Sequence, residues 1–187
     1  MKIVGGKWRG RKLHPLKRLP IRPTGDRAKS ALFDILSHSP IYTKWPILDS
    51  TVLDTFAGTG ALGLECLSRG AASVLFIDND CDSIALLQNN IKLLGAQTTT
   101  RVLHKDATKP GSPSISPTLI FLDPPYNTNL AETALRALLS SGWLPLHALV
   151  IVETPSKKKL RIPHSLQQIE FREYGNTGFW FLANGNS

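Results

Sequence analysis

Short, nearly continuous apolar runs alternate with stretches of helical periodicity along most of the chain. Apolar runs that predict strands lie at 51–54, 73–78, 99–104, 118–122 and 148–153. Helical patterns lie between them, at 60–70, 80–94 and 129–140. Continuous rather than alternating apolar runs are typical of strands buried on both faces, and strand–helix alternation is typical of a doubly wound parallel sheet. The pattern therefore predicts a Rossmann-like α/β fold.

The two ends of the chain depart from this alternation. Apolar residues recur at helical spacing over 24–36, which predicts an amphipathic helix. Two β-rich runs flank YGNTG at 174–178, which indicates an antiparallel hairpin. The fold class we predict is α/β, a mostly parallel, seven-stranded, doubly wound sheet with an antiparallel C-terminal strand. We assign residues 1–23 to a small, basic, β-rich arm and residues 24–187 to the main domain.

Positive charge is concentrated at the start of the chain. The net charge is +8, and ten of the 22 lysines and arginines lie in residues 1–30, where Asp26 is the only acid. The remaining residues are close to neutral, with 12 basic and 13 acidic side chains. A cationic arm on a near-neutral body indicates a polyanionic partner. Apolar residues interleaved with these charges, and a tight turn predicted at Gly5-Gly6, favour an ordered arm over a solvated leader.

Cysteine, histidine and hydropathy patterns exclude other classes of protein. Cys66 and Cys81 lie within helical patterns without metal-ligand spacing, and we interpret both as core residues of a reduced, intracellular protein. The five histidines form no cluster, so we predict no metal site. No apolar run approaches membrane-spanning length, and the basic start is not followed by the hydrophobic segment of a signal peptide. We expect a cytoplasmic monomer with no membrane partner.

A glycine-rich loop follows the strand at 51–54. Residues 58–63 read GTGALG, which fits the dinucleotide pattern G-x-G-x-x-G, and Asp78 ends the next strand twenty residues after Gly58. Several nucleoside cofactors share this geometry. Asp54, just before the loop, would repel a pyrophosphate but attract an ammonium or sulfonium group. We therefore predict S-adenosyl-L-methionine as the cofactor.

Further acids lie where later strands end. Ligands of open α/β sheets bind at the carboxyl ends of the strands, and Asp106 and Asp123 fall there. A row of carboxylates at this edge suits a cationic cofactor. Asp106 either accepts a hydrogen bond from the adenine amino group or is an ordinary loop acid.

The strand at 118–122 ends in the sequence FLDPPY. Two consecutive prolines supply carbonyls but no N–H groups, so they do not extend a sheet. A nucleobase amino group is a poor nucleophile because its lone pair is delocalised into the ring, and the Asp123 carboxylate and Pro124 carbonyl would accept its two hydrogens. Tyr126 would stack on an extruded base, which contributes about 1–3 kcal/mol. A simple turn is the alternative, because Asp-Pro is common in turns. We predict Asp123, Pro124, Pro125 and Tyr126 as the catalytic residues, without a strong general base.

These segments resemble the RsmD-type family, which methylates the N2 amino group of a guanine in 16S ribosomal RNA. The likeness runs through IVGGKWRGRKL at 3–13, RPTGDRAKSALFDIL at 22–36, VLDTFAGTGALGLECLSRGA at 52–71, FLDPPY at 121–126 and YGNTGFWFL at 174–182. The resemblance implies a class I methyltransferase that binds the small-subunit RNA, or its assembly intermediate, as substrate. The cofactor residues it implies are Asp54, Phe56, Gly58, Thr59, Gly60, Asp78, Asn79, Asp106 and Ala107. The RNA-binding residues it implies are Lys7, Arg9, Arg11, Arg22 and Arg27.

Other functions remain open on the sequence alone. The DPPY sequence also serves adenine-N6 methylation of DNA, although no second domain for reading a DNA sequence is evident. A non-catalytic RNA-binding factor in ribosome assembly would use the arm alone. A nicotinamide-dependent dehydrogenase would leave DPPY unexplained.

Overall fold

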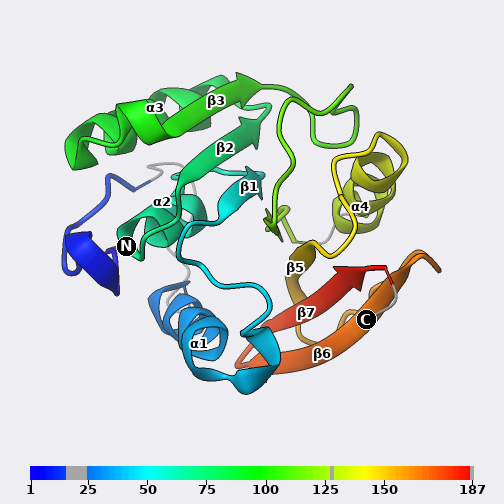
Figure 1. Cartoon of the computed structure of the whole chain (residues 1–187). Helices are drawn as coiled ribbons and strands as arrows, with labels where there is room; N and C mark the ends of the chain where they lie inside the picture. The colour runs from blue at the N-terminus through cyan, green and yellow to red at the C-terminus, as the bar shows by residue number, and fades with distance from the viewer. Residues whose placement is uncertain (16–24, 127–128, 186–187) are drawn as a thin grey trace.

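A seven-stranded sheet forms the centre of the computed structural model, which describes residues 1–15, 25–126 and 129–185 (Figure 1). The strands are β1 (Thr51–Thr55), β2 (Ser73–Asp78), β3 (Thr100–His104), β4 (Leu119–Leu122), β5 (Leu149–Pro155), β6 (Leu166–Tyr174) and β7 (Thr177–Asn184). The helices are α1 (Gly25–His38), α2 (Ala61–Ser68), α3 (Cys81–Leu94) and α4 (Leu130–Ser140). Three 3-10 turns, η1 (Gly6–Trp8), η2 (Pro40–Tyr42) and η3 (Gln97–Thr99), connect them.

The strand order is β3-β2-β1-β4-β5-β7-β6. Strands β1 to β5 pair in parallel, β7 is antiparallel to β5, and β6 is antiparallel to β7. The predicted α/β fold class and the C-terminal hairpin are thus confirmed. The chain runs outward from β1 in both directions, so the topological switch point lies between β1 and β4, where doubly wound sheets bind ligands.

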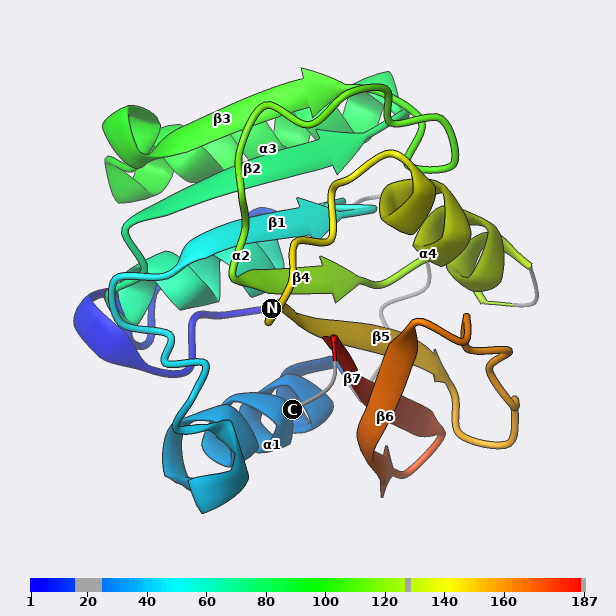
Figure 2. The same cartoon turned by 45° about the vertical axis from the view of Figure 1, so that its right-hand side comes forward.

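Helices cover both faces of this sheet. Val52 and Phe121 point into a core shared with α1, α2 and α3, whereas Leu53 and Ile120 point into a second core shared with α4. Figure 2 shows α2 and α3 on one side of the strands and α4 on the other. Because successive side chains of a strand point to opposite faces, these two cores also tell which face each residue at a strand end occupies.

The first fifteen residues fold against α2 beside the sheet (Figure 1). The prediction of short strands is met within residues 1–15 only by one isolated antiparallel bridge, Lys2 to Lys12. Gly6 has φ +71°, in agreement with the predicted tight turn. The arm still closes on itself, because the N–H groups of Ile3 and Leu13 bond the carbonyls of Arg11 and Met1, while the N–H groups of Val4 and Gly5 bind a side chain of α2. The predicted boundary between residues 23 and 24 lies outside the described residues.

The two cysteines differ in burial. Cys66 is fully buried on α2, as predicted, whereas Cys81 is exposed at the start of α3. The assignment of Cys81 to the core is therefore wrong. The buried stripe of α3 runs through Ser83, Leu87 and Leu94, and Cys81 does not lie on it. Over the described parts of the chain, no helix is long and apolar enough to cross a membrane.

Candidate active site

Three aspartates meet at the carboxyl ends of β1, β2 and β4. Asp54 pairs in register with Phe76 on β2 and with Phe121 on β4. Asp78 and Asp123 each lie two residues beyond those partners, so all three side chains project from the same face of the sheet. The carboxylates are close enough to interact, because Asp123 and Asp78 both raise the pKa of Asp54. The three acids therefore form one cluster at the switch point.

Asp54 lies deepest in this cluster. Its side chain is 2% exposed, and its Oδ2 accepts the N–H of Gly63, at 2.9 Å, in the first turn of α2. Burial raises its pKa well above the ordinary value, and the charges of Asp123 and Asp78 add to the rise. A cation bound here would favour the ionised form and relieve the repulsion. The cluster thus has the electrostatics of a site for a positively charged ligand.

The glycine loop is tied to Asp78. Asp78 Oδ2 accepts the N–H of Gly58 at 2.7 Å, and Oδ1 accepts the N–H of Asp80 at 2.9 Å. The loop backbone is left-handed at Phe56, Gly58 and Gly60, with φ of 58°, 53° and 78°. A Cβ at Gly60 would lie 2.3 Å from a Leu87 methyl carbon, so this position requires glycine for both conformation and space. Phe56 is a non-glycine residue in a conformation that is strained and frequent near functional sites.

Asp106 has a local partner that the sequence did not indicate. Its Oδ1 accepts the N–H of Thr108 at 2.8 Å and the Thr108 hydroxyl at 2.7 Å. These two hydrogen bonds lower the pKa of Asp106. In the structure Asp106 therefore stabilises the turn that it forms with Thr108. Its contact with adenine stays a prediction. Asn79 is exposed beside Asp78, and Ala107 is buried.

The DPPY segment follows β4 directly. Asp123 and Tyr126 are partly buried, Pro124 is buried and Pro125 is exposed. The Tyr126 hydroxyl donates to Glu153 Oε1 at 2.8 Å and lies 3.0 Å from the Thr177 hydroxyl. Glu153 was missed by sequence reasoning, although it ends the apolar run ALVIVE as Asp123 ends FLD.

The arm presents its cationic side chains to solvent. Lys7, Arg9, Arg11 and Arg27 are exposed, and the Lys7 ammonium lies 4.3 Å from the centre of the Trp8 ring. Arg22 lies outside the described residues. The exposed cations are the groups available to contact phosphates, and their role in binding stays a prediction.

A buried carboxylate holds the arm in place. Glu65, 0% exposed, accepts the N–H groups of Val4 at 2.8 Å and Gly5 at 2.7 Å. It also pairs with Arg69 at 2.9 Å and with Lys29 at 3.4 Å. A glutamate within an otherwise apolar helical face is the sequence signal that could have revealed this contact.

Asn90 joins the arm to the glycine loop. Its Oδ1 accepts the N–H of His14 at 2.8 Å, and its Nδ2 donates to the carbonyl of Thr59 at 2.9 Å. The Thr59 hydroxyl lies 3.2 Å from the Met1 sulfur. The basic arm and the predicted cofactor loop are therefore parts of one hydrogen-bonded unit.

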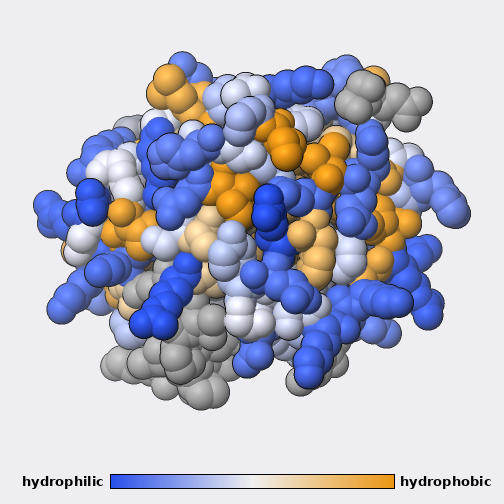
Figure 3. All heavy atoms as spheres, turned by 90° about the horizontal axis from the view of Figure 1, so that it is seen from below, coloured by the Kyte–Doolittle hydropathy of each residue, from blue (hydrophilic) through white to orange (hydrophobic). Residues whose placement is uncertain are grey.

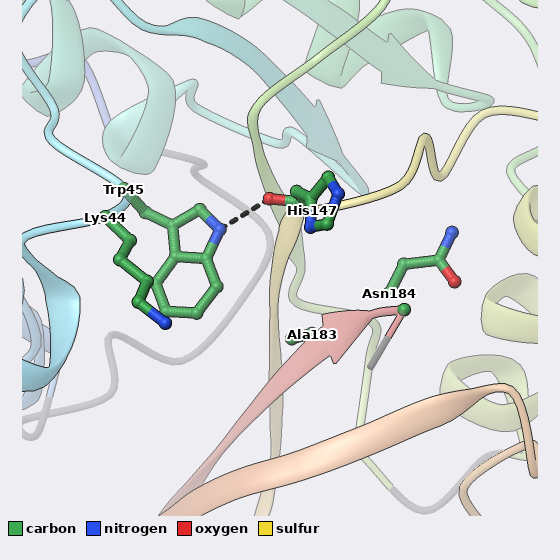
Figure 4. Close-up of a pocket in the computed structure, with 6 residues that line it drawn as sticks. Lys44, Trp45, His147, Ala183 and Asn184 are labelled. Atoms are coloured by element: carbon green, nitrogen blue, oxygen red, sulfur yellow. Dashed lines mark hydrogen bonds between the residues drawn. The ribbon is translucent and has the colours of Figure 1, made fainter. Parts of the chain in front are cut away.

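A separate pocket of about 190 Å³ lies at the other end of the sheet. It is lined by Lys44, Trp45, His147, Ala183, Asn184 and Gly185 (Figure 4). The indole N–H of Trp45 is not available to a ligand in this pocket, because it donates to the His147 carbonyl at 2.5 Å. His147 precedes β5, so this pocket is at the amino ends of the parallel strands, away from the three aspartates. It is not the candidate active site.

Two further features of the described residues bear on where a site could lie, namely the surface that carries α1 and β6 and the possible metal ligands. The face that carries α1 and β6 is mainly hydrophilic, with hydrophobic side chains gathered across its middle (Figure 3). Among the residues that the structure describes, no group of three or more His, Cys, Asp and Glu side chains is arranged to hold a metal. The aspartate cluster thus stays the best supported site.

Comparison with known proteins agrees with this architecture. The family model described as conserved hypothetical protein 95, the RsmD family, matches residues 1–183. The chain belongs to the RsmD family. Among curated members of this family, ribosomal RNA small subunit methyltransferase D of Haemophilus influenzae is 35% identical over 98% of this chain and 94% of its own length. The protein of the same name from Escherichia coli is 40% identical over 82% of this chain and 74% of its own.

A solved structure extends the RsmD-family likeness to three dimensions. The Escherichia coli protein yhhF superposes with a TM-score of 0.82 at 32% identity, covering 100% of this chain and 99% of that one. Because the match covers the whole chain, the architecture that this RsmD-family chain shares includes the arm, the glycine loop and the hairpin.

Proposed function

We propose that this chain transfers a methyl group from S-adenosyl-L-methionine to the N2 amino group of a guanine in 16S ribosomal RNA. The observation that carries the proposal is the cluster of Asp54, Asp78 and Asp123, in which burial and mutual repulsion raise the pKa of Asp54. The names of the family members from Haemophilus influenzae and Escherichia coli support small-subunit ribosomal RNA as the substrate. The bound cofactor would supply an electrophilic methyl carbon, whose bond to sulfur breaks with the electron pair passing to sulfur.

The residues of the cluster fit such a cofactor. Asp54 would accept from its ammonium group, and Asp78 from its ribose hydroxyls. The left-handed backbone at Gly58 and Gly60 supports close approach of the ligand to the loop. Asn79, Asp106 and Ala107 would border the nucleoside, as in the predicted site.

The DPPY segment would hold the guanine. The Asp123 carboxylate and the Pro124 carbonyl would accept the two hydrogens of the amino group and direct its lone pair at the methyl carbon. The nitrogen forms the new bond and loses a proton to Asp123 or to water. Holding the two partners in line lowers the barrier by about 7–11 kcal/mol in favourable cases, so positioning alone can supply much of the catalysis.

The arm would bind the RNA. Lys7, Arg9 and Arg11 are exposed on residues 1–15, and Arg27 is exposed on α1. We propose residues 1–23, which include Arg22, as the RNA-binding arm of a methyltransferase domain formed by residues 24–187. Its substrate would be the 16S RNA within the small subunit or an assembly intermediate, in the cytoplasm.

Methyl transfer from labelled S-adenosyl-L-methionine to small ribosomal subunits that lack the modification tests the proposal. We expect transfer by the wild-type protein and a fall in kcat of about 10²-fold or more in Asp123→Ala, the loss typical of one positioned transition-state contact. Asp34→Ala, which removes an exposed acid on α1, is the control and should keep the wild-type rate.

Two other outcomes would assign a different function. Transfer to duplex DNA in preference to ribosomal subunits would favour an adenine-N6 methyltransferase. Calorimetry that detects no binding of S-adenosyl-L-methionine would favour a non-catalytic assembly factor. Full activity of Asp123→Ala would refute the assigned role of that carboxylate.

A further inference from the structure

The phenol of Tyr126 is held at two points by strands outside the DPPY segment. Its hydroxyl donates to Glu153 Oε1 at 2.8 Å and lies 3.0 Å from Thr177 Oγ1. Glu153 belongs to β5 and Thr177 to β7, and these strands pair in an antiparallel register that sets Thr177 opposite Pro155. Both anchors therefore belong to one continuous ladder of backbone hydrogen bonds.

This part of the sheet is tightly packed. Thr177 is 5% exposed, and the next residue, Gly178, has no room for a side chain, because a Cβ there would lie 2.7 Å from the Phe171 ring. On the same two strands, Trp180 Nε1 of β7 donates to the Thr154 hydroxyl of β5 at 2.9 Å. Close packing of this kind fixes Thr177 and the backbone of both strands, since these cannot shift without displacing their neighbours.

The anchored hydroxyl lies beside the catalytic candidates. Leu122 of β4 pairs with Val152 of β5, so Asp123 and Glu153 are the next residues along two adjacent strands. Leu122 and Val152 both point into the core under α4. Asp123 and Glu153 therefore project from the opposite face, which is also the face of Asp54.

We infer that Glu153 and Thr177 are positioning residues that hold the Tyr126 hydroxyl, and with it the direction of the ring axis, in place for the acceptor base. This inference rests on the proposed function. A tyrosine ring can turn about two side-chain bonds, and ordering it when the base arrives would weaken stacking. Two hydrogen bonds to a rigid strand pair fix the hydroxyl and so remove the freedom about the first of these bonds before the base binds. Supporting hydrogen bonds of this kind hold functional groups in productive geometry.

Four variants test the tether directly. Tyr126→Phe keeps the ring and loses both hydrogen bonds, so we expect kcat to fall about tenfold, which is 1.4 kcal/mol or about one hydrogen bond. Thr177→Val and Glu153→Leu should each lower kcat, and Glu153→Gln should restore most of it because its amide oxygen still accepts from the phenol. KM for the RNA should change less than about twofold, since phosphate contacts dominate affinity. The Kd for S-adenosyl-L-methionine should stay at the wild-type value.

Coupling between the partners separates a tether from two independent effects. If Tyr126 and Glu153 act through one hydrogen bond, the double variant Tyr126→Phe/Glu153→Leu should be no slower than the slower single variant. Losses in kcat that multiply in the double variant would overturn the inference.

A matched control is available elsewhere in the chain. Tyr42, on η2, donates to Glu170 Oε2 on β6 at 2.8 Å, which is the same type of tyrosine–glutamate bond. Tyr42→Phe should lower the melting temperature and leave kcat at the wild-type value. An equal loss of kcat in Tyr42→Phe would mean that general stability explains the effect, and it would overturn the inference.

The experiment distinguishes the two levels of the proposal. A wild-type protein that methylates small subunits, together with an equally active Tyr126→Phe, would overturn the tether and leave the proposed function standing. A wild-type protein that transfers no methyl group to them would overturn both.

Discussion

Replacing Glu65 by glutamine tests what holds the arm on the domain. The wild-type carboxylate is fully buried and accepts two arm N–H groups, from Val4 at 2.8 Å and Gly5 at 2.7 Å. Its negative charge also pairs with Arg69 at 2.9 Å and Lys29 at 3.4 Å. Glutamine keeps the size and shape of the side chain but removes its charge and one of its acceptor oxygens. The substitution therefore probes the electrostatic role of Glu65 without opening a cavity.

The expected loss of stability is large. Breaking a buried ion pair from one side costs about 3–5 kcal/mol, because the partner charge stays in a poorly solvated place. The amide NH₂ would also oppose one of the two arm N–H donors, and a buried donor without an acceptor costs about 1–3 kcal/mol. These costs overlap, so we expect a loss of about 4 kcal/mol in the free energy of unfolding. For a chain of this size, that corresponds to a fall in melting temperature of roughly 8–16 °C.

Urea and thermal unfolding followed by circular dichroism measure this loss. Hydrogen exchange at the Val4 and Gly5 amides reports whether the arm is released locally before the domain unfolds. The control is Arg172→Ala, which removes a pair with Glu170 at 2.5 Å in which the arginine is 53% exposed. Exposed pairs contribute about 0.2–1 kcal/mol, so this control should change little. A loss below about 1 kcal/mol in Glu65→Gln would refute the reasoning, because a typical exposed pair would then contribute as much.

Two further predictions concern charge at the site and on the arm. Burial raises the pKa of Asp54 in the folded protein, so its contribution to stability is present at low pH and is lost as the pH rises through the folded pKa. Asp54→Asn, which keeps an acceptor for Gly63, should thus be more stable than the wild type at pH 7, with a difference that shrinks in urea titrations toward pH 4, and should bind S-adenosyl-L-methionine about 10- to 100-fold more weakly. An unchanged affinity would contradict the assignment. Lys7→Ala and Arg9→Ala should each lower the slope of log K against log salt for RNA binding by about 0.7–0.9 without changing cofactor affinity; an unchanged slope would show that the side chain does not contact phosphate.

The fold could be predicted because its signals are local in sequence. Each of the four inner parallel strands, β1, β2, β4 and β5, is a short apolar run, and its continuity reflects burial on both faces rather than one. Gly95 at the end of α3 has φ +66°, the left-handed conformation that ends many helices, so the helix boundary was also visible. The strand order was not predicted, because the preferred hand of a crossover does not say in which direction along the sheet the chain moves next.

The contacts that tie the site together were less visible. Glu65, Asn90 and Glu153 act through residues between 27 and 76 positions away, and no local pattern records such partners. Cys81 was misassigned because one residue near the end of a helix does not reveal which way it faces. The arm was expected to hold more strand, but its N–H groups at Val4 and Gly5 find their acceptor on α2. In each case a contact with a distant part of the chain determined the outcome, and the local sequence does not identify that contact.

Two buried carboxylates, one in the predicted cofactor site and one under the arm, lie in opposite electrostatic surroundings. At the switch point, Asp54 is buried beside like charges, which opposes folding at neutral pH and favours a cationic ligand. On α2, Glu65 is buried among opposite charges and backbone donors, which favours the attached arm. The two acids lie at opposite ends of the segment DTFAGTGALGLE, the loop and first turns of one helix. Because Asn90 bonds both the arm and the loop, displacement of the arm would remove a hydrogen bond from the side chain that holds the carbonyl of Thr59 in the glycine loop.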